Sequence, residues 1–307
     1  MSISSTDESL YLKLVEPFTY LRENTKGKGF RNTLLSCFNL YFNLGDDDLK
    51  LVQEVIDILH NSSLLIDDVE DDGVIRRGVP CAHRIFGIGN TINAGNMMYF
   101  KAWESLLQLN IPRLSEVYVA SMMKLHFGQG LELYWRDNKK CPTEDEYLEM
   151  VVCKTGELFK LGVTIMECVS INRGMSLDVH ITEGIKKFCD ILGMFYQIKN
   201  DVDDLVDGDD GIEFAHDLKE GKYSFPIQYC INMKNMKLGI GKKDMSVNER
   251  RVIVTQIADA GGIRYSQEYM FRLQGDAQTL LHSMASLSSS AKCDEMVKKL
   301  VSIVSKD

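Results

Sequence analysis

The chain has little of what marks several common protein classes. It holds only five prolines in 307 residues, and no apolar stretch approaches the roughly 20 residues of a membrane-spanning helix. Its eight cysteines are scattered without a Cys-x-x-Cys pair, so neither a zinc site nor a disulfide framework is indicated. The N-terminal segment lacks the basic and apolar regions of a secretory signal. We therefore expect a cytoplasmic protein without stable membrane insertion.

Basic charge is also in short supply. Lysine and arginine number 35 against 44 aspartates and glutamates, which gives a net charge of -9. Because phosphate backbones attract basic surfaces, this balance argues against a nucleic-acid partner. The hydrophobic content of 45% is that of a globular protein. An anionic ligand would therefore need basic residues that are gathered locally.

Helical periodicity dominates the rest of the chain. Apolar residues recur at three- and four-residue steps in segments such as 51–59 and 151–166. Thr143–Glu146 and Ser246–Glu249 have the pattern of capping boxes. No alternating run is long enough to predict a strand, and the chain has no repeats. We expect an all-α fold, a single domain over residues 1–307 built from about ten or more helices. The expected irregular segments are 24–30, 72–80, 136–142, 205–212 and 235–246.

Two acidic clusters each follow an apolar helical pattern. The first, LLIDDVEDDG, places Asp67 and Asp71 one helical turn apart with Asp68 beside them. The second, NDVDDL, places Asp201 and Asp204 on one face. Like charges at this spacing repel each other, and oxygen ligands without histidine or cysteine suggest Mg²⁺. Two such helix ends could form one multi-metal site, although each cluster alone could also be a solvated helix end.

Basic residues and glycines gather close to the first acidic cluster and before it. RRG occupies residues 76–78, and GKGFR occupies residues 27–31. Glycines allow a backbone to approach an anion closely, and the arginine fork matches phosphate oxygens. Together with the aspartates, these residues suggest a diphosphate that is held by metal on one side and by guanidinium on the other.

Six segments resemble, in order, those of the trans-isoprenyl diphosphate synthases, and most of all those of the eukaryotic geranylgeranyl diphosphate synthases. The segments are GKGFR (27–31), HNSSLLIDDVEDDGVIRRG (60–78), LHFGQGLELYWRD (125–137), KTGELF (154–159), FYQIKNDVDDL (195–205) and DLKEGKYSFPI (217–227). The resemblance implies the isoprenoid synthase fold, with helices around a central cavity. It also implies Mg²⁺, three ions in each active site, and a homodimer or higher homo-oligomer.

The resemblance carries roles to individual positions. In the first aspartate motif Asp67 and Asp71 bind Mg²⁺ with Asp68 between them, and Asp201 and Asp204 match part of the second metal motif. The allylic diphosphate is contacted by Arg76, Lys154, Thr155, Gln197 and Lys222. The isopentenyl diphosphate pocket contains Gly27, Lys28, Arg31, His60 and Arg77. Arg76 and Lys154 join the three aspartates of the first motif as catalytic residues, although His60 could be a core histidine and Lys154 a solvated one.

The implied reaction suits these residue types. Mg²⁺, lysine and arginine neutralise the leaving diphosphate, so that the allylic C–O bond ionises to a carbocation. The alkene of isopentenyl diphosphate attacks this cation. A proton is then lost, in our interpretation to the released diphosphate, which completes an ionisation, condensation and elimination sequence. Water must be excluded because it would quench the cation.

Product length depends on the space near the first aspartates. Ser62 and Ser63 lie one helical turn before Asp67, and their small side chains leave room for a longer chain. Tyr99, Phe100 and His126 match the deeper floor of geranylgeranyl diphosphate synthases, although the two aromatic residues could be ordinary core positions. We expect a C20 product from farnesyl diphosphate, with a farnesyl-producing synthase as an alternative.

The second motif departs from the family pattern. Asn200 stands where the family has its first aspartate, so the affinity for that metal should fall. Ile212 stands near the position of a lysine that has no counterpart here. A terpene synthase would instead lose Lys28, Arg31, His60 or Arg77, all of which are kept. A weakly active or regulatory subunit of a prenyl diphosphate synthase remains the other alternative.

Overall fold

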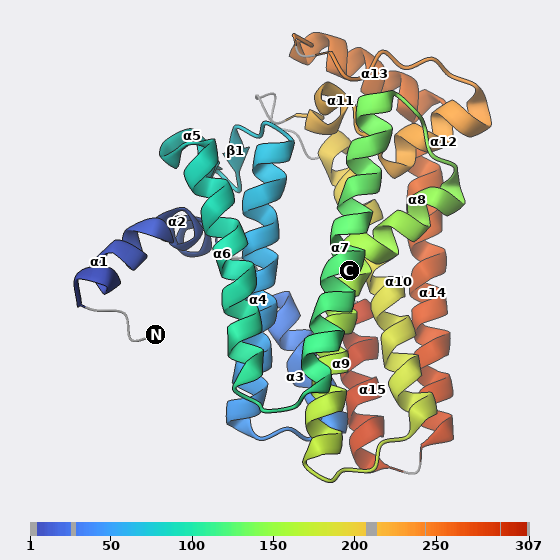
Figure 1. Ribbon diagram of the computed structural model, residues 1–307. Coiled ribbons are helices and arrows are strands. Elements are labelled where there is room, and N and C mark those ends of the chain that lie inside the picture. The colour runs from blue at the N-terminus through green and yellow to red at the C-terminus, as the bar shows by residue number, and fades with distance from the viewer. Residues whose placement is uncertain (1–4, 26–28, 207–213, 243, 289, 306–307) are drawn as a thin grey trace. The chain divides into compact units, whose positions relative to one another are not determined.

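The computed structural model describes residues 5–25, 29–206, 214–242, 244–288 and 290–305. Gly27, Lys28 and Ile212 lie outside these ranges. The described residues are overwhelmingly helical (Figure 1), which confirms the predicted all-α fold. None of the helices in these ranges has the length and apolar content that crossing a membrane requires.

The chain divides into two units. The first unit contains residues 1–118 and 164–176, and the second contains residues 119–163 and 177–307. Two of the three boundaries fall inside long helices, α7 (Arg113–Asn138) and α9 (Glu157–Asn172), and the third follows α9. The expectation of a single domain over the whole chain stays a prediction.

The first unit is organised around α4 and α6, which lie side by side (Figure 1). Val52, Val55 and Leu65 on α4 are completely buried, and each such side chain stabilises the fold by about 1.5–3 kcal/mol. Gly95 on α6 allows the close approach, because a Cβ there would lie 2.9 Å from Cδ1 of Ile66. The helices and strands of this unit are α1 (Ser5–Leu14), α2 (Glu16–Asn24), α3 (Phe30–Phe42), α4 (Asp46–Glu70), β1 (Ile75–Arg76), β2 (Val79–Pro80), α5 (Ala82–Phe86) and α6 (Ile88–Leu107).

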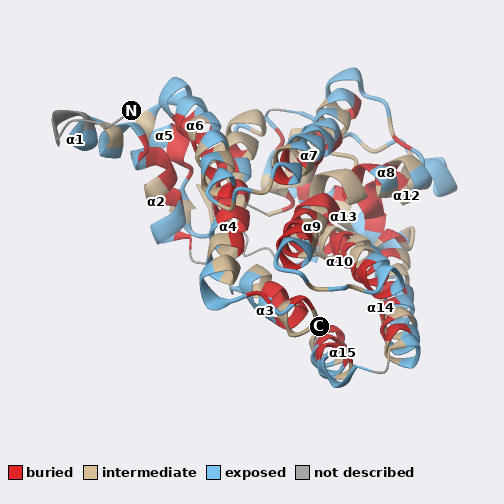
Figure 2. Ribbon diagram, turned by 60° about the horizontal axis from the view of Figure 1, so that its bottom comes forward, coloured by how far each residue is buried: buried red, intermediate tan, exposed pale blue. Residues whose placement is uncertain are grey.

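The second unit packs α10 against α14. Buried residues follow one side of α14 and exposed residues the other (Figure 2). Both predicted capping boxes form, with Thr143 and Glu146 at the start of α8 and with Ser246 and Glu249 at the start of α13. Besides α7 and α9, the elements are α8 (Glu144–Val151), η1 (Val152–Gly156), α10 (Val179–Val206), α11 (His216–Glu220), α12 (Phe225–Lys234), α13 (Val247–Asp259), α14 (Gly262–Leu287) and α15 (Ala291–Val304).

Candidate active site

The first aspartates lie at the C-terminal end of α4. This is the negative end of the helix dipole, where carboxylates are unfavourable unless a cation is near. Arg76 supplies such a cation, since its Nε donates to Oδ1 of Asp68 at 2.7 Å and its Nη2 to Oδ2 of Asp67 at 3.1 Å. Asp68 is only 2% exposed, and burial raises its pKa while Arg76 opposes that rise. Asp68 therefore anchors Arg76.

The side chain of Asp67 is 20% exposed, and Asp71 caps the end of α4 one turn later. Across the part of the chain that the structure describes, no three histidine, cysteine or carboxylate groups gather into a metal site of their own. Mg²⁺ commonly binds through one or two carboxylates together with water and substrate phosphates. The oxygen donors of Asp67 and Asp71 fit such an ion, which would supply positive charge for a diphosphate.

The turn between β1 and β2 holds Arg77 in an unusual conformation. Arg77 and Gly78 have φ values of 52° and 86°, the pattern of the type I′ turn that two-residue hairpins favour. Nη1 of Arg77 donates to the carbonyl of Thr25 at 2.7 Å. Arg84 braces the preceding loop, because its guanidinium donates to the carbonyls of Asp72 and Gly73. The hairpin thus fixes the arginine at its tip.

Arg31, His60 and Arg77 form what we call the basic cluster. Burial lowers the pKa of Arg31 to about 10, with Arg77 adding to the effect. Burial, followed by Arg31, Arg77 and Arg76, lowers the pKa of His60 well below its usual range. The structure therefore brings together these three residues of the predicted isopentenyl diphosphate pocket. A cluster that disfavours its own positive charge is suited to bind an anion.

Lys154 and Thr155 lie in η1, a single π-helical turn of the kind often found at functional sites. Two glycines bring neighbouring helices onto it. A Cβ at Gly128 would lie 2.5 Å from the backbone nitrogen of Lys154, and one at Gly193 would lie 2.6 Å from Cα of Gly156. Nζ of Lys154 pairs with Oε2 of Glu132 at 2.5 Å. Lys154 is thus held by a partner carboxylate, and is not a solvated helical lysine.

Asp201 lies inside the second unit and is 4% exposed. Its Oδ2 accepts hydrogen bonds from the hydroxyl of Tyr147 at 2.5 Å and from the backbone nitrogen of Phe225 at 2.7 Å. Its Oδ1 accepts from Nε2 of Gln197 at 2.9 Å. Burial raises the pKa of Asp201 above its usual range, and Asp217 adds to the rise.

Asp204 holds the start of α11. Its Oδ1 accepts from the backbone nitrogen of His216 at 3.0 Å and its Oδ2 from that of Asp217 at 3.3 Å. Burial and then Asp217 raise the pKa of Asp204 as well. The oxygens of Asp201 and Asp204 thus accept hydrogen bonds within the second unit, and the role of these two residues as Mg²⁺ ligands stays a prediction. We call Asp201, Asp204 and Asp217 the carboxylate cluster.

Asp217 faces a lysine, and Asn200 is open to solvent. The Asp217 side chain is 19% exposed, with Nζ of Lys222 at 3.7 Å from its Oδ1, and Asn200 is exposed at the same end of α10. Nζ of Lys222 also lies 2.8 Å from Oε2 of Glu220. Lys222, a predicted diphosphate contact, is therefore oriented by two acids.

The residues expected to set product length differ in their surroundings. Ser62 is completely buried, whereas Ser63 is exposed and donates to the carbonyl of His60. Tyr99 is partly buried, and burial followed by Glu70 raises its pKa. Phe100 is 67% exposed, and His126 is also exposed. Ser62 has the most enclosed position of the five, and the roles of all of them in chain length stay predictions.

The sequence reasoning missed four residues that organise these clusters. They are Arg84, Glu132, Tyr147 and Asp217. Glu132 and Asp217 lie in segments that carry the family resemblance, so their motifs were a signal that could have found them. Tyr147 occupies an apolar position of α8, where periodicity alone predicts only a core residue.

The described residues thus comprise helices with acidic ends, a basic cluster with a partly buried arginine, and lysines paired with carboxylates. These residue types suit a protein that handles diphosphates. The chain matches the polyprenyl synthetase family over residues 12–256. It belongs to this family of trans-prenyltransferases, which join prenyl diphosphates by condensation.

Several relatives are similar over most of the chain. A geranylgeranyl pyrophosphate synthase of Dictyostelium discoideum is 39% identical over 264 residues, which are 83% of each chain. A geranylgeranyl pyrophosphate synthase of Metarhizium robertsii is 36% identical over 94% of this chain and 86% of its own. A protein named terpene synthase from Matsumurasca onukii is 37% identical over 90% of this chain and 89% of its own.

Proposed function

We propose that the protein is a geranylgeranyl diphosphate synthase, which adds isopentenyl diphosphate to farnesyl diphosphate with the help of Mg²⁺. The observation that carries the proposal is the basic cluster of Arg31, His60 and Arg77, found together with an intact first aspartate motif. A prenyl diphosphate synthase needs a second diphosphate pocket for its nucleophilic substrate. The similarity to geranylgeranyl pyrophosphate synthases supports the C20 product.

Each cluster has a definite part in this proposal. Arg31 and Arg77 bind the diphosphate of isopentenyl diphosphate, and His60 lies beside them as a neutral hydrogen-bonding group. Asp67 and Asp71 hold Mg²⁺, whose charge assists departure of the allylic diphosphate, while Asp68 keeps Arg76 in place. In the second unit Lys154, Thr155, Gln197 and Lys222 bind the allylic diphosphate.

A terpene synthase is the second candidate, because one relative bears that name. Such an enzyme ionises an allylic diphosphate without a second diphosphate substrate, so nothing would maintain the basic cluster. His60 illustrates the point. Its Nε2 is buried without a hydrogen-bond partner among the described residues, which is unfavourable for a core histidine, and a bound anion could provide that partner.

The test is to incubate the purified protein with labelled isopentenyl diphosphate, Mg²⁺ and dimethylallyl, geranyl or farnesyl diphosphate in turn. The dephosphorylated products are then separated by size. We expect a C20 alcohol, formed most rapidly from farnesyl diphosphate. A C15 product would overturn the product length, and a hydrocarbon or cyclic alcohol formed without isopentenyl diphosphate would favour a terpene synthase. Absence of condensation with every primer would favour a regulatory subunit.

We also propose that the enzyme is a homodimer. Val119, Met123, Phe127 and Tyr134 follow one side of α7 and are each more than half exposed. Large apolar side chains in a continuous row are unusual on a monomer surface, and a second copy would bury them. Sedimentation equilibrium should give twice the chain mass, and Phe127→Glu should shift it toward one chain mass. A monomeric wild-type protein would contradict this proposal.

A further inference from the structure

Tyr147 has a buried phenol whose hydroxyl reaches a buried carboxyl group. It lies in the first turn of α8, just after the capping box that fixes the start of this helix, and it is 2% exposed. Its ring packs against Phe225, with the centroids 5.3 Å apart. Its hydroxyl donates to Oδ2 of Asp201 at 2.5 Å. A phenylalanine would fill the same space, so packing alone does not require the hydroxyl.

Asp201 is linked by hydrogen bonds to two of the predicted diphosphate contacts, Gln197 and Thr155. Its Oδ1 accepts from Nε2 of Gln197, which turns the amide so that Oε1 points to Thr155. The hydroxyl of Thr155 donates to that Oε1 at 3.0 Å. One chain of hydrogen bonds therefore runs from Tyr147 through Asp201 and Gln197 to Thr155. It sets the orientation of the Gln197 amide and the direction of the Thr155 proton.

We propose that Tyr147 is a positioning residue for the allylic diphosphate, and that it acts through Asp201 on Gln197 and Thr155. In this role Asp201 is an internal anchor and does not bind Mg²⁺ directly. The inference rests on the proposed function, because it takes Gln197 and Thr155 as contacts of the allylic substrate. Removing the Tyr147 hydroxyl loosens the anchor and leaves the shape of the core unchanged.

The experiment compares Tyr147→Phe, Asp201→Asn and the double variant with the wild type. We expect Tyr147→Phe to raise the KM for farnesyl diphosphate about fivefold, since it removes a hydrogen bond to a carboxyl group that acts on the substrate only through Gln197 and Thr155. The KM for isopentenyl diphosphate and the Mg²⁺ concentration for half-maximal rate should not change. Because Tyr147 and Asp201 belong to one chain of hydrogen bonds, loss of the Tyr147 hydroxyl should change the KM little once Asp201 is replaced. The effects of the two substitutions on KM should therefore not add.

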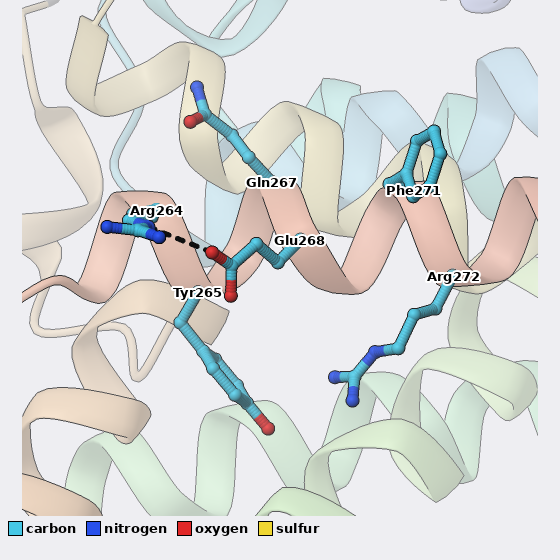
Figure 3. A pocket seen from close by; sticks show the side chains of 6 residues that line it. All are labelled: Arg264, Tyr265, Gln267, Glu268, Phe271 and Arg272. Atoms are coloured by element: carbon cyan, nitrogen blue, oxygen red, sulfur yellow. Dashed lines mark hydrogen bonds and ion pairs between the residues drawn. The ribbon is translucent and has the colours of Figure 1, made fainter.

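Tyr265→Phe is the matched control. Tyr265 belongs to the same aromatic group, with its ring stacked on Phe225, but its hydroxyl donates to Glu144 at 2.7 Å. It borders a surface hollow of about 470 Å³ along α14, and its side chain projects from the helix opposite Phe271 (Figure 3). This variant should keep the wild-type KM for both substrates. An equal rise in KM in Tyr265→Phe would overturn the proposal, because it would indicate a general packing effect.

A binding measurement can test the role of Tyr147 even if the protein does not catalyse the proposed condensation. Calorimetry with inorganic diphosphate and Mg²⁺ should show weaker diphosphate binding in Tyr147→Phe, without any need for turnover. A wild type without condensation activity would defeat the proposed function, whereas the calorimetric comparison would still test the anchor. Additive effects in the double variant, or a weakened affinity for Mg²⁺ in Asp201→Asn, would overturn the positioning role.

Discussion

The basic cluster of the first unit and the carboxylate cluster of the second unit are electrostatic opposites. In the first, arginines and burial keep His60 neutral. In the second, burial raises the pKa of Asp201 and Asp204, and Asp217 adds to both shifts. Each cluster therefore gathers groups of one kind whose charged form is disfavoured by burial. Groups with shifted pKa values are typical of functional sites. In the proposed function the first cluster binds a diphosphate, whereas Asp201 and Asp204 of the second accept hydrogen bonds from within their own unit.

The largest expected effect follows from a substitution at the end of α4. Asp67→Asn removes one of the two carboxylates expected to hold Mg²⁺ and also unbalances Arg76, so kcat should fall about 1000-fold. Steady-state kinetics at saturating Mg²⁺ measures this loss. Asp47→Asn, which changes an exposed acid in the first turn of the same helix, should keep wild-type kinetics. A kcat within tenfold of the wild type in Asp67→Asn would remove Asp67 from the metal site.

Removing a positive charge from the basic cluster should change the KM for one substrate only. Arg31→Gln should raise the KM for isopentenyl diphosphate about 100-fold, because a partly buried guanidinium makes charge-assisted hydrogen bonds to phosphate oxygens. The KM for farnesyl diphosphate should stay within about twofold. Arg22→Gln is the control, since Arg22 is a half-exposed residue paired with Asp57 at 2.9 Å. Equal increases in both KM values would show that Arg31 supports the fold and not the substrate.

A substitution in the second unit that adds a carboxylate should strengthen Mg²⁺ binding. Asn200→Asp places a further negative charge at the end of α10, so the Mg²⁺ concentration for half-maximal rate should fall about tenfold. The rate at saturating Mg²⁺ should change little. Asn138→Asp, at the exposed end of α7, serves as the control. An unchanged metal titration in Asn200→Asp would show that this position is not a ligand.

The difference between the clusters also explains what the sequence could predict. The helices, both capping boxes and the grouping of Asp67 and Asp68 with Arg76 depend on neighbours within a few turns of the chain. By spacing alone Asp201 and Asp204 look like Asp67 and Asp71, since each pair lies on one face at a helix end. Their hydrogen bonds differ because all the donors to these two carboxylates except Gln197 come from other helices.

Tyr147, for example, lies 54 positions from Asp201 in the sequence. Periodicity reports which face of a helix is buried, but it does not report which donor meets a buried carboxylate. The π-helical turn at Lys154 is likewise a product of tertiary packing, because it depends on the close approach of Gly128 and Gly193.

The smallest expected effect concerns the pH dependence of stability without ligands. The pKa of His60 in the folded protein lies below its unfolded value of about 6.5, so the unfolded chain binds more protons below that pH. The stability from the neutral histidine is thus complete above pH 6.5 and is lost as the pH falls. Urea unfolding should show the wild type losing about 1 kcal/mol more than His60→Gln between about pH 7 and pH 5.5.

His282→Gln is the control for this measurement, because His282 is an exposed histidine on α14. Its pH profile should match that of the wild type. The raised pKa values of Asp201 and Asp204 have the opposite sign, since the folded carboxylates keep protons that the unfolded chain has released. Their contribution to stability is present below about pH 4 and is lost as the pH rises. Parallel pH profiles for the wild type and His60→Gln would show that the basic cluster does not hold its histidine neutral.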